Sequence, residues 1–106
     1  MIVDHLQAPY YAVIFSTLLA DTLTDYERTA NRMEELAKQQ PGYLGIESAR
    51  NQVGITVSYW ENLEAISRWK NNIEHIEARE RGRAVWYKKY ELRICKVERA
   101  YGFEKL

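Results

Sequence analysis

Residues 10–19 read YYAVIFSTLL, and this stretch decides which folds the chain can adopt. It is rich in β-branched and aromatic residues, which favour a strand. Successive side chains of a strand point to opposite faces of its sheet. Both faces are apolar here, with Tyr11, Val13 and Phe15 on one and Ala12, Ile14 and Leu18 on the other. A strand of this kind is covered on both of its faces.

The residues that follow predict a helix. Thr24-Asp25-Tyr26-Glu27 has the spacing of a capping box, in which the first and last side chains satisfy backbone N–H groups. A buried stripe continues at helical spacing through Tyr26, Ala30, Met33 and Ala37. The helix ends at Gln40-Pro41-Gly42, because proline cannot continue it and glycine accepts a left-handed turn.

Two strands come next, at residues 43–50 and 53–60. Their short connection implies an antiparallel hairpin. On one face of the second strand three small residues precede a tryptophan: Gly54, Thr56, Ser58 and Trp60. Small side chains leave space over that face, and either a ligand or a helix can fill it.

A second helical region contains a predicted break. Asn62 can cap a short helix, and a second capping pattern begins at Asn71. Trp69 and His75 are six residues apart, so on one straight helix they would lie on different sides. A bend at Asn71 brings them together again. On the new helix one stripe holds His75, Arg79, Gly82 and Trp86, and the glycine leaves that stripe thin.

A long strand, residues 89–101, completes the pattern. Its apolar residues change from one alternating set to the other, which predicts a β-bulge near Ile94. The order β-α-β-β-α-α-β predicts a ferredoxin-like α+β fold, with an antiparallel sheet and its helices on one face. The first strand needs cover on the other face as well. A second copy of the same sheet supplies it most simply, so we expect a homodimer.

Composition limits the classes of partner and compartment. The 106 residues fit one domain, 1–106, with an N-terminal tail at residues 1–9. Fifteen basic and fifteen acidic residues give no net charge, which argues against nucleic acid or an anionic membrane as the main partner. Cys95 is the only cysteine, which suits a reducing compartment. The sequence has neither an apolar run of about 20 residues nor a signal-peptide pattern, so we expect a cytoplasmic protein.

The charges are unevenly distributed along the chain. Residues 79–99 carry eight basic side chains against three acidic ones. This asymmetry leaves three interpretations open: an anionic ligand, a neighbour of opposite charge, or simply a solvated face.

Three runs of the chain carry a resemblance to a known family: GYLGIESAR (42–50), GITVSYWENLEAISRWKNNIEH (54–75) and ARERGRAVWYKKYELRICKVERAYGF (78–103). Their shared pattern is Ser58-Tyr59-Trp60, Trp69, His75, Gly82-Arg83 and Trp86-Tyr87. On these residues the chain resembles the antibiotic biosynthesis monooxygenase (ABM) family over residues 10–103, and in particular a subgroup of small bacterial proteins. The resemblance implies a dimeric α/β barrel, in which two ferredoxin-like sheets pack face to face.

The resemblance also implies an activity. Members of the family oxidise small aromatic, quinol-like compounds with molecular oxygen and without flavin, metal or another cofactor. A second branch degrades haem, and other members have signalling roles. The haem branch is similar to this chain at Trp69, but it has an asparagine on the first strand and a histidine where this chain has Arg79. Haem binding or degradation is therefore disfavoured. A non-catalytic, small-ligand-binding or stress-related dimer is the alternative to a monooxygenase.

Six residues are candidates for the site. His75 is the candidate base and Arg79 the candidate anion-stabilising group. The candidate pocket residues are Tyr59, Trp69, Asn72 and Trp86, although Tyr59 has the opposite strand parity to Ser58. Each has a structural alternative: Trp69 can simply pack in the core, His75 can be a hydrogen-bonding partner, and Arg79 can pair with Glu74, Glu77 or Glu80. Two histidines seventy residues apart predict no metal site.

Overall fold

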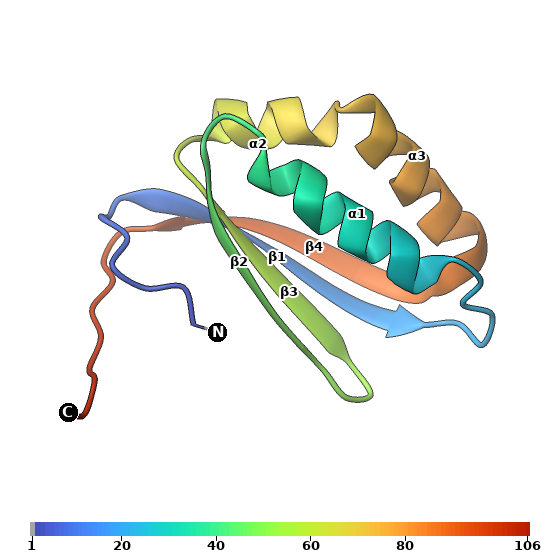
Figure 1. Cartoon of the computed structure of the whole chain (residues 1–106), viewed down its shortest axis with the longest axis horizontal. Helices are drawn as coiled ribbons and strands as arrows, with labels where there is room; N and C mark the ends of the chain where they lie inside the picture. The colour runs from blue at the N-terminus through green and yellow to red at the C-terminus, as the bar shows by residue number, and fades with distance from the viewer. Residues whose placement is uncertain (1) are drawn as a thin grey trace.

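The structure is a computed structural model, and it describes residues 2–106. It consists of a sheet of four strands with a layer of helices on one face (Figure 1). The elements in chain order are β1 (Tyr10–Leu19), α1 (Tyr26–Lys38), β2 (Tyr43–Arg50), β3 (Gly54–Trp60), α2 (Leu63–Lys70), α3 (Ile73–Arg81), the π-helical turn η1 (Gly82–Trp86) and β4 (Tyr87–Val97).

The strand order is β2-β3-β1-β4, and every neighbouring pair is antiparallel. This is the ferredoxin-like arrangement, and it confirms the predicted fold class. β1 lies between β3 and β4 inside the sheet. Its central position agrees with the apolar character of both its faces.

The register of the sheet sets which residues face the helices. Val13 pairs with Ser58, Phe15 with Thr56, and Thr17 with Gly54. Paired residues lie on the same face. The small residues of β3 therefore lie beside the larger side chains of β1, beneath the helices.

The predicted bulge near Ile94 is wrong. The pairing of β4 with β1 is continuous from Tyr10–Val97 to Leu18–Lys89, and its one irregularity lies between Leu18 and Leu19. The apolar residues change sets because β4 has apolar side chains on both faces, so no extra residue is needed.

The break between α2 and α3 is confirmed, but its cap is one residue later than predicted. The Asn72 side-chain oxygen accepts the His75 backbone N–H at 3.2 Å, whereas Asn71 ends the preceding helix. The predicted cap of α2 is confirmed, since the Asn62 side-chain oxygen accepts the Ala65 N–H at 2.8 Å.

The capping box at Thr24 is wrong. Asp25 precedes α1 in a left-handed conformation (φ 62°) and makes no side-chain cap. The backbone carbonyl of Thr24 instead accepts the indole N–H of Trp86 at 2.8 Å. A contact between residues far apart in sequence thus takes the place of the predicted local pattern.

The hydrophobic core lies where the end of α1 and the start of α2 meet β3. Trp60 is fully buried there and packs with Ala37, Ala65 and Ile66. Gly42 has the predicted left-handed conformation (φ 86°), and an added Cβ would lie 2.6 Å from the Ala65 Cβ. The turn between α1 and β2 therefore lies close against α2, and this compact core occupies only one end of the helix layer.

The other face of the sheet has no helix over it (Figure 1). Part of it is covered by the N-terminal segment, because the Val3 N–H donates to a Glu47 carboxylate oxygen at 2.9 Å and the Val3 methyl groups lie against Gly45. Within residues 2–106, no helix has the length and apolar character needed to cross a bilayer.

Candidate functional site

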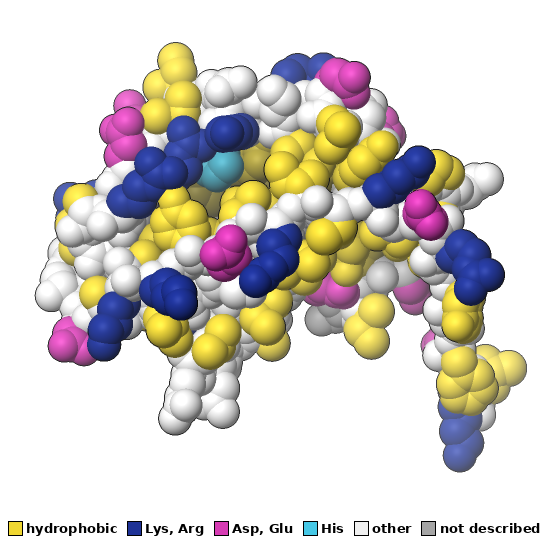
Figure 2. Space-filling view, turned by 180° about the vertical axis from the view of Figure 1, so that it is seen from behind, with side chains coloured by type: hydrophobic (Ala, Val, Ile, Leu, Met, Phe, Trp, Pro, Cys, Tyr) yellow, Lys and Arg dark blue, Asp and Glu magenta, His cyan; other side chains and the backbone are white. Residues whose placement is uncertain are grey.

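A cavity of about 660 Å³ lies between the sheet and the helices. Its floor includes Val13 and Phe15 of β1 and Gly54, Thr56 and Ser58 of β3. From behind, the molecule shows a hollow with a histidine side chain inside it and basic side chains beside it (Figure 2). The volume is typical of a site for a small organic ligand.

Short side chains on both sides create this cavity. Below it are the three small residues of β3, and above it is the stripe of α1 formed by Tyr26, Ala30, Met33 and Ala37. The side chain of Ala30 is a single methyl group, whereas Ala37 at the end of the stripe packs with Trp60 in the core. The helix layer therefore covers the sheet here without filling the space beneath it.

The break between α2 and α3 brings Trp69 and His75 together. Their rings are stacked, with centroids 4.3 Å apart and planes inclined by 13°. Trp69 in turn stacks on the buried Trp60 at 6.2 Å. The core thus holds the indole, and the indole holds the imidazole at the wall of the cavity.

The surroundings of His75 set its tautomer and its charge. Its Nδ1 lies 2.9 Å from the backbone carbonyl of Trp69. A carbonyl only accepts, so Nδ1 carries the proton and Nε2 keeps its lone pair. Burial lowers the pKa of His75 below 6.5; the Trp69 carbonyl opposes this shift and the charge of Arg79 adds to it. At neutral pH the ring is an unprotonated base.

Arg79 lies one helical turn beyond His75 and also lines the cavity. Its Nε is buried and has no hydrogen-bond partner, and its Nη1 makes one long contact of 3.4 Å to the Lys70 carbonyl. No ion pair within residues 2–106 includes it. The Nε is thus the one donor of this half-buried cation that is shielded from water without a partner in the protein.

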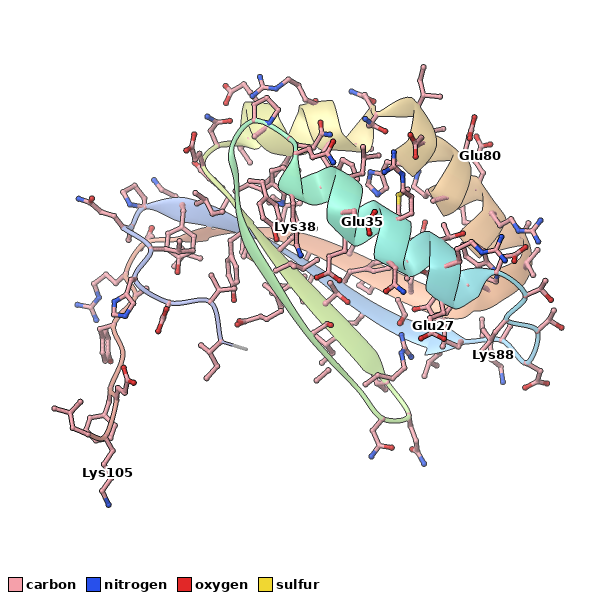
Figure 3. All side chains as sticks on the ribbon, in the orientation of Figure 1. Glu27, Glu35, Lys38, Glu80, Lys88 and Lys105 are labelled. Atoms are coloured by element: carbon pink, nitrogen blue, oxygen red, sulfur yellow. The ribbon has the colours of Figure 1, made fainter. Side chains whose placement is uncertain are left out.

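The alternative ion pairs proposed for Arg79 are not formed. Glu74 makes a bidentate pair with Arg32 of α1 instead, at 3.0 and 3.1 Å. Glu80 projects from the outer side of α3 (Figure 3). The acidic side chains of α3 thus leave the guanidinium of Arg79 without a carboxylate.

Of the six candidate residues, four line this one cavity: Trp69, His75, Arg79 and Trp86. Tyr59 lies on the helix-free face, where its hydroxyl donates to Glu47 at 2.5 Å and its ring packs against Tyr10. Strand alternation explains this, because its neighbours Ser58 and Trp60 face the helices. Asn72 is occupied as the cap of α3 and does not line the cavity.

The model of the antibiotic biosynthesis monooxygenase (ABM) family matches residues 9–81. The chain belongs to this family. The uncharacterized protein YqjZ of Bacillus subtilis (strain 168) is 48% identical over 101 residues, covering 93% of this chain and 89% of YqjZ.

Solved structures share the fold of this ABM protein at low sequence identity. SnoaB of Streptomyces nogalater, described as a cofactor-independent oxygenase, superimposes with a TM-score of 0.74 at 13% identity, covering 88% of this chain and 97% of SnoaB. Rv0793 of Mycobacterium tuberculosis superimposes with a TM-score of 0.77 at 8% identity, covering 88% of this chain and 99% of Rv0793. At such identities the likeness establishes the architecture alone.

The ABM cavity has a second polar region that sequence reasoning missed. It consists of Thr17, Arg50, Arg83, Tyr87 and Tyr90. Burial raises the pKa of the Tyr87 hydroxyl well above its usual value, with Tyr26 adding to the shift and Arg50 opposing it. The hairpin pairing of Arg50 with Gly54 was the available signal, because a long side chain opposite a glycine has room to lie across the sheet.

Proposed function

We propose that this ABM protein is a cofactor-independent monooxygenase acting on a small aromatic, quinol-like compound. The observation that carries the proposal is the pairing of His75 with Arg79 inside the cavity. One is a neutral imidazole, and the other is a cation without a carboxylate partner. Membership of the ABM family and the fold shared with SnoaB support the same class of reaction by analogy.

In this proposal His75 is the base. A quinol hydroxyl ionises only weakly at neutral pH, so a positioned acceptor accelerates its deprotonation. The Nε2 of His75 is free to accept because the Trp69 carbonyl holds the proton at Nδ1. The lowered pKa of His75 keeps the ring in its basic form without requiring high pH.

Arg79 stabilises the resulting anion. The substrate becomes negatively charged as its proton leaves, and a nearby guanidinium in a partly dry cavity lowers the energy of that charge. The buried Nε of Arg79 has no partner in the unliganded protein, so an oxyanion can supply one. The stacked Trp69 and the edge of Trp86 offer apolar walls for an aromatic ring.

The substrate supplies every electron that the reaction needs. The quinolate reduces O₂, and a carbon–oxygen bond forms at a ring carbon. One oxygen atom stays on the ring and the other leaves as water, so quinol plus O₂ gives hydroxyquinone plus water. Of the four electrons taken up by O₂, two come from hydroxylating the ring and two from oxidising the quinol to the quinone.

Oxygen uptake with a panel of benzo-, naphtho- and anthra-hydroquinones tests the proposal. We expect at least one to be consumed faster than its spontaneous oxidation in buffer. His75→Gln should then lower the rate by roughly 100- to 10,000-fold, with little change in melting temperature. Uptake at the buffer rate for every compound would favour the alternative, a non-catalytic binding protein. A shifted Soret band on mixing with haemin would favour the haem branch.

We also propose that the protein is a homodimer formed through the helix-free face. Several apolar residues of that face remain accessible, with Leu18 36% exposed and Ile55 45% exposed. Ile14 and Val57 are paired at the middle of the same face. Packing of two such sheets would bury well above about 2,000 Å² in total, as obligate dimers do.

A further inference from the structure

The cavity contains more positive charge than the proposed deprotonation requires. Four basic side chains line it, Arg50, Lys70, Arg79 and Arg83, against one acidic side chain, Glu34. Glu34 already has a partner, since Lys38 lies 3.6 Å from its carboxylate. The chain as a whole has no net charge, so the cavity is a local concentration of positive charge in a neutral protein.

Two of these cations, Arg50 and Arg83, lie in the polar region beyond Arg79. The Nη2 of Arg50 donates to the hydroxyl of the buried Thr17, and the Nε of Arg83 donates to the hydroxyl of Tyr90 at 2.6 Å. Neither forms an ion pair with any carboxylate of residues 2–106. By contrast, Arg28 and Arg32 on α1 are both paired with acidic side chains. All three arginines that line the cavity, Arg50, Arg79 and Arg83, are thus without a carboxylate partner among residues 2–106.

Gly54 allows Arg50 to take this position. Arg50 pairs with Gly54 across the hairpin, and the guanidinium lies where a Cβ on Gly54 would be. Thr17 is paired with the same glycine from the other side. The Thr17 hydroxyl accepts from Arg50, so its own proton remains available for a ligand. The Arg50 guanidinium and the Thr17 hydroxyl thus form one cluster of hydrogen-bond donors in the cavity wall.

Aromatic rings surround these donors on the sheet side. Phe15 lies 5.5 Å from Tyr87 and 5.3 Å from Tyr90, measured between ring centroids. The planar guanidinium group binds carboxylates through two parallel hydrogen bonds, and the rings supply an apolar surface beside the exposed side chains of Arg50 and Arg83. The combination suits an anionic group attached directly to an aromatic ring.

We infer that the ligand of this cavity is an aromatic carboxylate, whose carboxylate binds Arg50 while its phenolic hydroxyl lies at His75. The inference rests on the proposed function, because it assigns the second functional group of the same substrate. Arg83 is linked to Arg50 through Tyr90, which pairs with the Thr17 that Arg50 contacts. Arg83 lies eight residues beyond His75 along α3 and η1, so the two ends of the site are about 12 Å apart at the α-helical rise of 1.5 Å per residue. A fused bicyclic ring with its hydroxyl and carboxylate at opposite ends suits a site of that length.

The experiment compares 6-hydroxy-2-naphthoate with its methyl ester, by calorimetric titration into the full-length chain without oxygen. The two ligands share the ring and the hydroxyl and differ in the anionic charge. We expect the acid to bind about ten- to a hundredfold more tightly than the ester. This difference should shrink as salt is added, and the wild-type protein alone suffices to measure it.

Variants then locate the anion. Arg50→Gln should bring the affinity ratio of acid to ester close to one, and Arg50→Lys should leave an intermediate ratio. Arg28→Gln removes an exposed arginine paired with Asp25 and should keep the wild-type ratio. Equal binding of acid and ester to the wild type, no binding of either, or an unchanged ratio in Arg50→Gln would each overturn the inference.

Oxygen uptake separates this inference from the proposed function. If a neutral hydroquinone is consumed but the acid has no advantage over its ester, the anion site is wrong and the monooxygenase proposal stands. If the acid binds through Arg50 but no quinol is consumed, the ligand class stands and the proposed activity is wrong.

Discussion

The two faces of the sheet are built from alternate residues of the same strands, yet they are incomplete in opposite ways. On β3, strand alternation directs the side chains of Thr56 and Ser58 toward the helices and those of Ile55, Val57 and Tyr59 away from them. The first face has a cover but too little side-chain volume, so a cavity remains beneath the helices. The second has large side chains but little cover. A covered hollow favours a ligand, whereas an uncovered apolar surface favours a protein partner.

The largest effect is expected from an acidic residue on the helix-free face. Val57→Asp would place two carboxylates in the proposed dimer interface, which we expect to raise the dissociation constant by roughly a thousandfold or more. Sedimentation should then give a species of 12.5 kDa in place of one twice as large. Gln52→Asp, in the turn of the hairpin, is the matched control and should stay dimeric. A wild-type protein that sediments as a monomer at micromolar concentration would contradict the comparison of the two faces.

The next effect concerns the neighbouring residue on the opposite face. Thr56→Leu adds volume to the floor of the cavity, so we expect it to reduce oxygen uptake by about a hundredfold at a given substrate concentration. The free energy of unfolding should not fall, because the added methyl groups enter empty space and do not overpack a core. The dimer should also persist. Full activity in Thr56→Leu would show that the substrate does not occupy this cavity.

Tyr59→Phe tests the assignment of Tyr59 to the helix-free face. It removes the hydrogen bond to Glu47 and should lower the free energy of unfolding by about 1 to 2 kcal/mol. Oxygen uptake should be unchanged.

The same bond gives this effect a pH dependence. The Tyr59 hydroxyl, followed by the Val3 N–H, lowers the pKa of the Glu47 carboxyl. The stabilisation is therefore present above the ordinary pKa of glutamate and is lost as the pH falls through the lowered one. Denaturant titrations should show that the free energies of unfolding of wild type and Tyr59→Phe converge in acid. A difference that stays constant with pH would mean that the ionised Glu47 carboxylate does not strengthen the hydrogen bond.

A smaller effect distinguishes the two asparagines at the break between α2 and α3. Asn72→Ala removes the N-cap of α3 and should cost roughly 1 kcal/mol of unfolding free energy. Asn71→Ala is the natural control, because Asn71 ends α2 through its backbone N–H and its side chain makes no capping hydrogen bond. This variant should stay within about 0.5 kcal/mol of wild type. Equal losses in the two variants would mean that the cap is not what holds His75 against Trp69.

The smallest expected effect is the contribution of His75 to the pH dependence of stability. Its pKa is lower in the folded chain than the ordinary 6.5, mainly through burial. The unfolded chain therefore takes up a proton first as the pH falls. The free energy of unfolding should decrease from about pH 6.5 down through the folded pKa. His75→Gln should remove this part of the pH dependence. If wild type and variant had the same pH profile of unfolding free energy, the imidazole would be exposed to water in the folded chain.

Local patterns along the chain were enough for the elements and their order. β-branched and aromatic composition identified the first strand, and the stretch from Pro41 to Gly42 marked the end of α1, because these signals depend on neighbouring residues only. The cap of α1 and the supposed bulge in β4 were predicted wrongly. Thr24 is held by Trp86, sixty-two positions later, and no local pattern contains such a contact.

The candidate site likewise has residues that local patterns predicted and residues that they did not. The break after α2, and with it the proximity of Trp69 and His75, followed from helix periodicity and a capping pattern. Tyr59 was grouped with them although its parity placed it on the other face. Arg50 was missed because its proximity to Arg83 and Tyr90 depends on pairing across all four strands.

By itself, the sequence determined a ferredoxin-like sheet with helices on one face, a broken second helix and the proximity of Trp69 and His75. Each of these follows from periodicity, from turn chemistry or from the directions in which side chains leave a helix or strand. Only the tertiary structure decided that the space above Gly54 is occupied by the Arg50 guanidinium, and that Glu74 pairs with Arg32 rather than with Arg79. Such choices depend on the distances between elements remote in sequence, which packing of the whole chain determines.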